Sequence, residues 1–113
     1  GWTMTAQKDL VERVRDALRA RNPREVPMFG GVSFMVEDRM VVAARREGTL
    51  LLRIDPTDAE DLLTRPGAHP ALMGADRPMG DGWISVEQAA LQGPGLESWL
   101  EPALTFHAAR GAE

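Results

Sequence analysis

The chain has 113 residues, of which 43% are hydrophobic, and a formal net charge of −4 at pH 7. This is enough apolar content for the core of one domain, which we expect to span residues 1–113. The absence of cysteine excludes disulfides, thiolate metal sites and cysteine nucleophiles. No apolar run reaches about 18 residues, and charged residues interrupt the N-terminus, so we expect a cytoplasmic, bacterial-type protein without membrane contact.

Charge is distributed unevenly along the chain. Residues 1–54 carry ten Lys and Arg against seven Asp and Glu, whereas residues 55–113 carry three against ten. Such asymmetry marks either an interaction surface or two solvated faces of different charge. An acidic domain is a poor candidate for binding a phosphate backbone, so we expect no direct nucleic-acid binding.

The first predicted helix spans about residues 5–21. Thr5 can cap it, apolar residues recur at helical spacing between positions 10 and 18, and Pro23 follows its end. Met4 can serve as an initiator, so we expect residues 1–4 to be a cloning remnant or disordered.

Three strands are predicted next, over about residues 28–36, 39–45 and 49–54. Their connections, at Glu37-Asp38 and at residues 46–48, are short enough to require an antiparallel meander. Side chains alternate between the two faces of each strand. In the first strand Val32, Phe34 and Val36 share one face, opposite Ser33 and Met35; in the third, Leu50, Leu52 and Ile54 share one face, opposite Leu51 and Arg53.

A second helix is predicted to open at Asp55-Pro56, with Asp55 as its cap and Pro56 in its first turn, and to end before Gly67. A second hairpin is predicted from about residues 71–79 and 82–86, turning at Gly80-Asp81-Gly82. Ser85 can instead cap a short helical turn over residues 87–91.

The last predicted helix starts at Pro94, with a kink or break at Pro102 and a frayed tail over residues 108–113. Its apolar stripe consists of Leu96, Trp99, Leu100, Ala103, Leu104 and His107. The resulting order is α-β(3)-α-β(2)-α. Helices packed on one face of an antiparallel sheet make this a two-layer α+β domain.

Four segments carry a family resemblance: Met28-Phe29-Gly30-Gly31 before an apolar strand, Leu50-Leu51-Leu52-Arg53-Ile54-Asp55, Met79-Gly80-Asp81-Gly82-Trp83, and Glu97-Ser98-Trp99-Leu100. In this order they resemble the N-terminal domain of the TfoX/Sxy competence regulators over about residues 6–108, although Leu51 replaces the usual aromatic residue. The resemblance implies a fold similar to that of secretion chaperones, in a stand-alone TfoX N-terminal-like domain. It supplies no catalytic residues.

Seven residues are candidates for binding a ligand or a partner: Met28, Phe29, Gly30, Gly31, Arg53, Arg77 and Trp83. The glycine pair could present backbone N–H groups to an anion, but it leads into a strand, which favours a bulge or a close strand approach. Arg53 could bind an acidic ligand or pair with a carboxylate at the sheet edge. Arg77 and Trp83 could form a cation–π platform or an ordinary hairpin contact.

Catalysis needs a nucleophile beside its base or two tuned carboxylates. Ser33, Ser85 and Ser98 lack the context of an activated nucleophile, and His69 and His107 are not at helical spacing for a metal pair. We therefore predict no catalytic residue, no metal site and no cofactor, and a protein that is not an enzyme.

The leading hypothesis is a small regulatory module that binds another protein or itself through the exposed sheet face, a sheet edge and the basic first helix. Met35, Met40, Met73 and Met79 suit adaptable contacts, or fill the core. A homodimer fits this hypothesis, and family analogy adds transcription or competence regulation.

Two alternatives stay open at this point. The first is a small-ligand-binding domain with a pocket between residues 28–31, Arg53 and the second hairpin. The second is nucleic-acid binding through basic residues near the first helix, namely Arg13, Arg15, Arg19, Arg21 and Arg24. The identity of the partner or ligand does not follow from the sequence.

Overall fold

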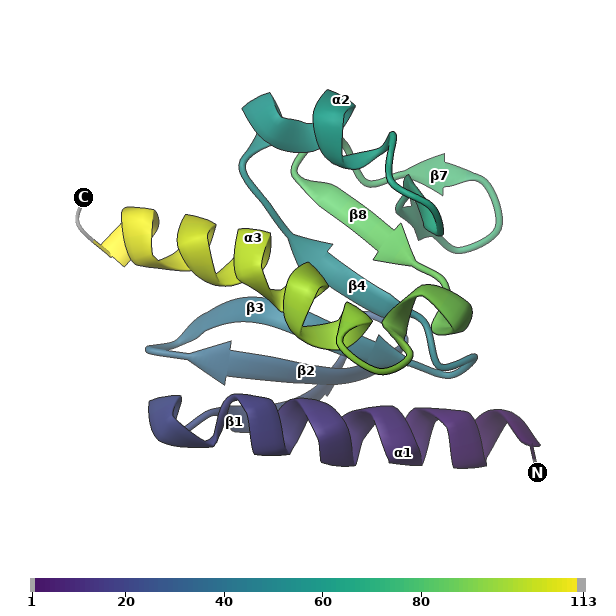
Figure 1. The fold of residues 1–113 in the computed structure, drawn as a ribbon, viewed down its shortest axis with the longest axis vertical. Helices are drawn as coiled ribbons and strands as arrows, with labels where there is room; N and C mark the ends of the chain where they lie inside the picture. Colours follow the sequence, from purple (N-terminus) through teal and green to yellow (C-terminus); the bar gives the residue numbers. More distant parts are fainter. Residues whose placement is uncertain (1, 112–113) are drawn as a thin grey trace.

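Helices α1 (Trp2–Ala17) and α3 (Gly95–Gly111) lie across the same face of a six-stranded antiparallel sheet (Figure 1). The strand order is β1-β2-β3-β4-β8-β5, and strands β6 and β7 form a separate two-stranded hairpin. This computed structural model describes residues 2–111. It confirms the predicted α+β fold with helices on one face of an antiparallel sheet.

The first helix starts earlier than predicted. Helix α1 already includes the backbone of residues 2–4, which were expected to be a remnant or disordered, so Thr5 lies inside the helix and is not its cap. Gly1 lies outside the described residues. A 3₁₀ turn, η1 (Arg19–Arg21), follows the helix, and Asn22 ends it with a positive φ of 49°.

The single strand predicted over residues 28–36 is in fact a hairpin of two strands, β1 (Arg24–Met28) and β2 (Gly31–Val36). Phe29 and Gly30 form its two-residue turn, with φ values of 60° and 75°. Two positive φ values give a turn whose twist matches that of the paired strands. The apolar run conceals this turn because Phe29 seldom adopts such a conformation.

Gly31 has a different role from Gly30. A Cβ atom at Gly31 would lie 2.1 Å from the carbonyl oxygen of Ala44 in the neighbouring strand. This position therefore requires glycine for close approach of the strands, as the structural interpretation of the pair predicts.

Strands β3 (Arg39–Arg45) and β4 (Leu50–Arg53) lie where predicted. Glu37 and Asp38, both with positive φ, form the turn between β2 and β3. The predicted alternation is confirmed. One face contributes Phe34, Val36, Leu50, Leu52 and Ile54 to the main core, while Leu51 belongs to a smaller cluster on the other face. Residues of α1 and α3 complete the main core, including Leu10, Val14, Leu18, Leu96, Trp99 and Leu100.

Asp55 caps the second helical segment as predicted, because its carboxylate accepts a hydrogen bond from the Thr57 N–H at 3.0 Å. The 3₁₀ turn η2 (Pro56–Asp58) leads into the short helix α2 (Ala59–Leu62).

The second predicted hairpin is only partly correct. Strand β8 (Trp83–Val86) pairs with β4 and also with β5 (Ala68–Pro70), a segment that was expected to be a loop. Between them, β6 (Leu72–Met73) and β7 (Arg77–Pro78) pair with each other within the predicted first strand. Ser85 lies inside β8, and the short turn η3 (Gln88–Leu91) follows it.

Helix α3 continues through Pro102 without a break and remains helical as far as Gly111. The predicted break is therefore wrong, and so is the expected fraying of residues 108–111; residues 112–113 lie outside the described part. The predicted apolar stripe is confirmed, since every member is buried or partly buried. No helix within residues 2–111 is long and apolar enough to cross a membrane.

Candidate functional site

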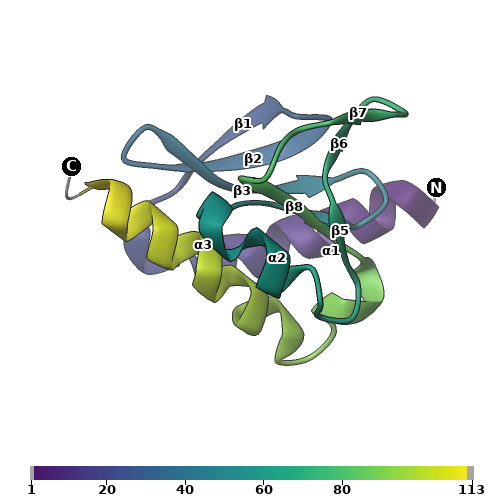
Figure 2. The ribbon, with the colours of Figure 1, turned by 90° about the horizontal axis from the view of Figure 1, so that it is seen from above.

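The face of the sheet opposite α1 and α3, here called the open face, carries a small apolar cluster. Met40, Ala43, Leu51 and Ala71 are buried in it, and the partly buried Phe29, Met35, Met79 and Trp83 pack around them. Figure 2 shows the β6–β7 hairpin on this side of the sheet and the helices on the other. The open face is thus covered only in part.

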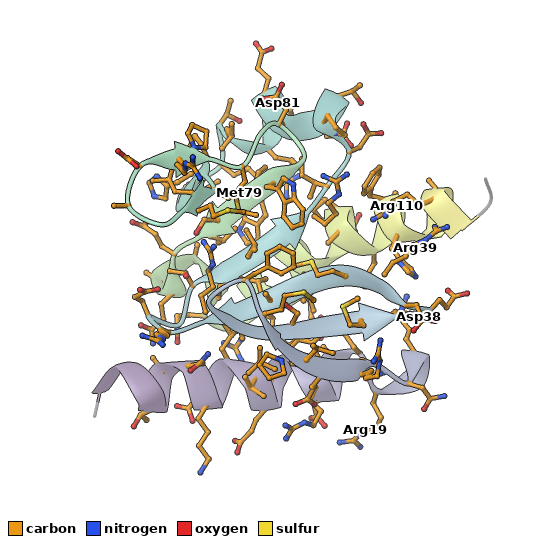
Figure 3. The ribbon with its side chains drawn as sticks, turned by 180° about the vertical axis from the view of Figure 1, so that it is seen from behind. Arg19, Asp38, Arg39, Met79, Asp81 and Arg110 are labelled. Carbon is orange, nitrogen blue, oxygen red and sulfur yellow. The ribbon has the colours of Figure 1, made fainter. Side chains whose placement is uncertain are left out.

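Three large hydrophobic side chains of the described residues are notably exposed: Met28 at 37%, Leu72 at 37% and Met73 at 52%. Arg45 ties their segments together, because its Nε donates to the Phe29 carbonyl at 3.0 Å and its Nη2 donates to the Leu72 carbonyl at 3.2 Å. The β1–β2 turn and the β6–β7 hairpin therefore meet on the open face, which is the side seen in Figure 3.

Proline protects both edges of the sheet. Strand β1 forms one edge of the sheet. Met28 and Gly31 form the hydrogen-bonded pair that closes the two-residue turn, so the peptide groups of residues 25 and 27 point away from β2. Pro27, at one of these outward positions, has no N–H to offer another strand. In β5, Gly67 and Ala71 hydrogen-bond towards β8, which points Pro70 outward. Proline at an outward position hinders the addition of another strand. Of the surfaces in the leading hypothesis, the structure thus favours the face over the edges.

A stack of aromatic and cationic side chains lies beside the open face, where β4 ends. The Arg53 guanidinium carbon is 4.9 Å from the centre of the Trp83 ring and 5.5 Å from that of the Phe106 ring. Arg110 lies over Phe106 at 5.3 Å, and the Phe29 ring lies 5.3 Å from Trp83. This arrangement holds Arg53 between two aromatic rings.

Gly82 makes room for this stack. A Cβ atom at Gly82 would lie 2.2 Å from Arg53 Nη1, and the Gly82 carbonyl accepts from the same nitrogen at 3.5 Å. Burial lowers the pKa of the Arg53 guanidinium, and the nearby Arg110 charge lowers it further. Among residues 2–111, no carboxylate lies within ion-pair distance of Arg53.

The structure brings together three of the seven predicted site residues, Phe29, Arg53 and Trp83. Met28 lies exposed beside them, and Gly30 and Gly31 shape the hairpin. The predicted platform had the correct aromatic residue but the wrong cation, because Arg53 stacks on Trp83. Arg77 lies exposed on β7 and makes no cation–π contact in the described structure.

Sequence reasoning missed Phe106, Arg110 and Gly82. Phe106 and Arg110 are four residues apart on α3, a spacing that places side chains on one helix face. Gly82 directly precedes Trp83, which was a usable signal for a close approach.

Side chains occupy the place predicted for a ligand pocket, because Arg53 and Phe29 both contact Trp83 there. A hollow of about 430 Å³ lies instead beside α1, lined by Lys8, Val11 and Arg15 among others. Another, of about 460 Å³, lies between α1 and α3. The pocket alternative thus gains no support from the geometry at its predicted place.

The basic residues near α1 are largely engaged within the molecule. Arg15 binds Glu25 through two hydrogen bonds of 2.6 and 2.8 Å, and Arg19 pairs with Asp16. Arg24 lies 3.3 Å from Asp38, and Arg13 donates to the carbonyls of residues 91 and 93. The absence of direct nucleic-acid binding stays a prediction, and these contacts are consistent with it.

The two histidines pair separately with carboxylates, His69 with Glu87 at 3.2 Å and His107 with Glu37 at 3.3 Å. Within the described part of the chain, no three His, Asp or Glu side chains gather as metal ligands do.

The sequence pattern of the TfoX N-terminal domain matches residues 7–107, which is nearly the whole chain. The chain belongs to this family. A search of curated proteins found no significant match. A protein from Pseudomonas syringae, with a crystal structure determined by a structural genomics consortium, superposes on this TfoX N-terminal domain protein with a TM-score of 0.57. The match covers 81% of this chain and 93% of that one at 17% identity, so it shows a shared fold alone.

Proposed function

We propose that this TfoX N-terminal domain protein is a non-enzymatic interaction module whose open face binds a protein segment with apolar and acidic side chains. The observation that carries the proposal is the exposure of Met28 on the β1–β2 hairpin and of Leu72 and Met73 on the β6–β7 hairpin, two segments that Arg45 joins on the open face. Exposed apolar patches of this kind mark interaction sites. Methionine suits them because its flexible thioether chain adapts to different partners.

The charge of the strands supports an acidic partner. The eight strands contain five arginines and one carboxylate, Glu25, and Glu25 turns towards α1, where it binds Arg15. By register, Arg24 and Arg53 share the open face; Arg24 already pairs with the exposed Asp38 at its rim, whereas Arg53 has no carboxylate partner among residues 2–111. Arg45 reaches across the face to Phe29 and Leu72. Carboxylates beside the apolar groups of a partner would complement this surface.

The same charge argues against a second copy of the chain as the occupant. In a two-fold dimer, a patch packs against its own copy, so the arginines of the two faces would approach each other. The proline-protected edges disfavour the other simple dimer, in which two sheets join edge to edge. We therefore propose a different protein as partner, with transcription or competence regulation, by family analogy, as the process.

Site-specific photo-crosslinking in native cells tests the proposal. A benzophenone amino acid replaces Met73, which is the most exposed of the three side chains. The matched control carries the same amino acid at Glu60, an exposed residue of α2. We expect one protein to crosslink at position 73 and not at position 60, through a segment that contains both apolar and acidic residues.

A second substitution, Met28→Lys, should reduce this adduct severalfold. It should leave the free energy of unfolding within about 0.5 kcal/mol, as is usual for surface substitutions. Light scattering on the purified protein adds the oligomeric state. No adduct, equal adducts at positions 60 and 73, or a dimer crosslinked to itself at position 73 would each overturn the proposal.

A further inference from the structure

Five arginines of the described chain are half-buried, and they fall into two groups. Arg13 and Arg45 satisfy their guanidinium groups by donating to backbone carbonyls at 3.3 Å or less. The other three are Arg39, Arg53 and Arg110. Arg39 Nη1 is fully buried and has no hydrogen-bond partner, and Arg53 has only the 3.5 Å contact with Gly82.

These three arginines come from elements that converge at one end of the sheet. Arg53 and Arg110 both stack on Phe106. Arg39 follows the β2–β3 turn, and the contact of His107 with Glu37 holds α3 against that turn. Figure 3 shows Arg39 and Arg110 at the same end of the molecule, and Figure 1 shows the end of α3 and the β2–β3 turn on the same side.

The cluster has no internal counterion in the described structure, since no carboxylate of residues 2–111 pairs with any of the three. Partly buried like charges repel each other and lose hydration, so such a cluster costs stability unless an anion neutralises it. Exposed arginines such as Arg21, Arg46 and Arg77 stay hydrated by water and do not pay this cost.

We propose that Arg39, Arg53 and Arg110 form a binding site for the phosphoryl group of a small phosphorylated molecule. The planar guanidinium fork matches phosphate oxygens and binds them through two hydrogen bonds. Three cations favour a phosphoryl dianion over a carboxylate, which carries one charge. The site is also preorganised, because Trp83, Phe106 and the space left by Gly82 fix the Arg53 guanidinium before a ligand arrives.

Calorimetric titration of the full chain with pyrophosphate, inorganic phosphate, glycerol phosphate and acetate tests the site. Stronger binding of glycerol phosphate would indicate an organic ligand, whereas equal or stronger binding of the inorganic ions would indicate a free phosphate. Either result supports the phosphoryl site. We expect Arg53→Gln and Arg110→Gln each to weaken binding by about tenfold or more, as the loss of charged hydrogen bonds does.

The control is Arg65→Gln, which removes the same charge from a different cation–π contact, that of the exposed Arg65 with the buried Trp99 ring at 5.2 Å. It should leave the affinity unchanged. Gly82→Ala keeps every charge but displaces the Arg53 guanidinium, so it too should weaken binding. In NMR spectra, phosphate should shift the indole N–H signal of Trp83 and not that of Trp99.

Absence of saturable binding, acetate binding as strong as that of phosphate, or equal loss in Arg65→Gln would overturn this proposal. Circular dichroism of each variant separates lost binding from lost folding. Arg53 belongs to both proposed surfaces, but the two proposals have different readouts. Phosphate titration measures the arginine cluster, whereas the crosslink at Met73 and its loss in Met28→Lys measure the open face, so either proposal can fail while the other stands.

Discussion

The two faces of the sheet are made by the same strands and differ sharply in what they bury. The helix face buries large aliphatic side chains and Phe34 almost completely against α1 and α3. The open face has a cluster of four buried residues surrounded by half-buried methionines and aromatic rings. Since buried apolar area is the main source of stability, the fold depends chiefly on one face. The other contributes less buried apolar area to stability, and we propose it as the binding surface.

The adjacent residues Phe34 and Met35 test this difference most strongly. Phe34 is fully buried on the helix face, and Met35 is partly buried on the open face. We expect Phe34→Ala to lower the free energy of unfolding by about 3–5 kcal/mol, as aromatic truncations in cores do. Met35→Ala should cost about 1 kcal/mol, because less apolar area leaves water contact at that site.

Urea unfolding followed by circular dichroism measures both changes. Similar losses for the two variants would show that the open face contributes to stability as much as the helix face. The two faces would then not differ in how much buried apolar area stabilises the fold.

A second test asks whether the β1–β2 hairpin depends more on the close approach of Gly31 to β3 than on the positive φ of Gly30. Gly31→Ala should cost about 3 kcal/mol, near the upper end of overpacking, because the new methyl group would meet the Ala44 carbonyl. Gly30→Ala should cost about 1–2 kcal/mol, because Gly30 has open space around it and only its positive φ of 75° is strained. Thermal unfolding distinguishes them, and a larger cost at Gly30 would contradict the close-approach role of Gly31.

Much of the fold could be predicted from local patterns, because the helix caps and the alternation of side chains along a strand depend on residues that are close in sequence. The alternation of Leu50, Leu51 and Leu52 between the faces and the cap at Asp55 both follow from spacing and residue type. The β1–β2 turn was missed because Phe29 continues an apolar run and gives no turn signal. Strand β5 was missed because its pairing partner, β8, lies far along the chain.

In the candidate site, too, the residues themselves could be predicted, whereas the contacts between distant segments could not. Trp83 and Arg53 were identified as candidates from residue type alone. Their pairing could not be predicted, since it depends on the register of β4 with β8. Arg110 and Phe106 join the stack only after α3 has packed against the sheet, so no local pattern near Arg53 could indicate them.

The smallest expected effect concerns the ion pairs on the two faces. On the helix side, Arg15 holds Glu25 through two hydrogen bonds, which lower the pKa of Glu25 below its ordinary value of 4.5. A carboxylate with a lowered pKa stabilises the folded state above its ordinary pKa, and this contribution is lost as the pH falls through the lowered value. We therefore expect Glu25→Gln to unfold with a weaker dependence on pH between about pH 6 and pH 3 than the parent protein.

Asp38→Asn is the matched control, because it removes the exposed partner of Arg24 at a positive-φ position that suits asparagine. Its side chain is 91% exposed, and exposed pairs of this kind contribute little to stability. The pH dependence of its unfolding should therefore stay close to that of the parent. If Asp38→Asn weakened the pH dependence of unfolding at acidic pH as much as Glu25→Gln did, this pH dependence would not arise mainly on the helix side. The difference between the faces would then lie in apolar burial alone.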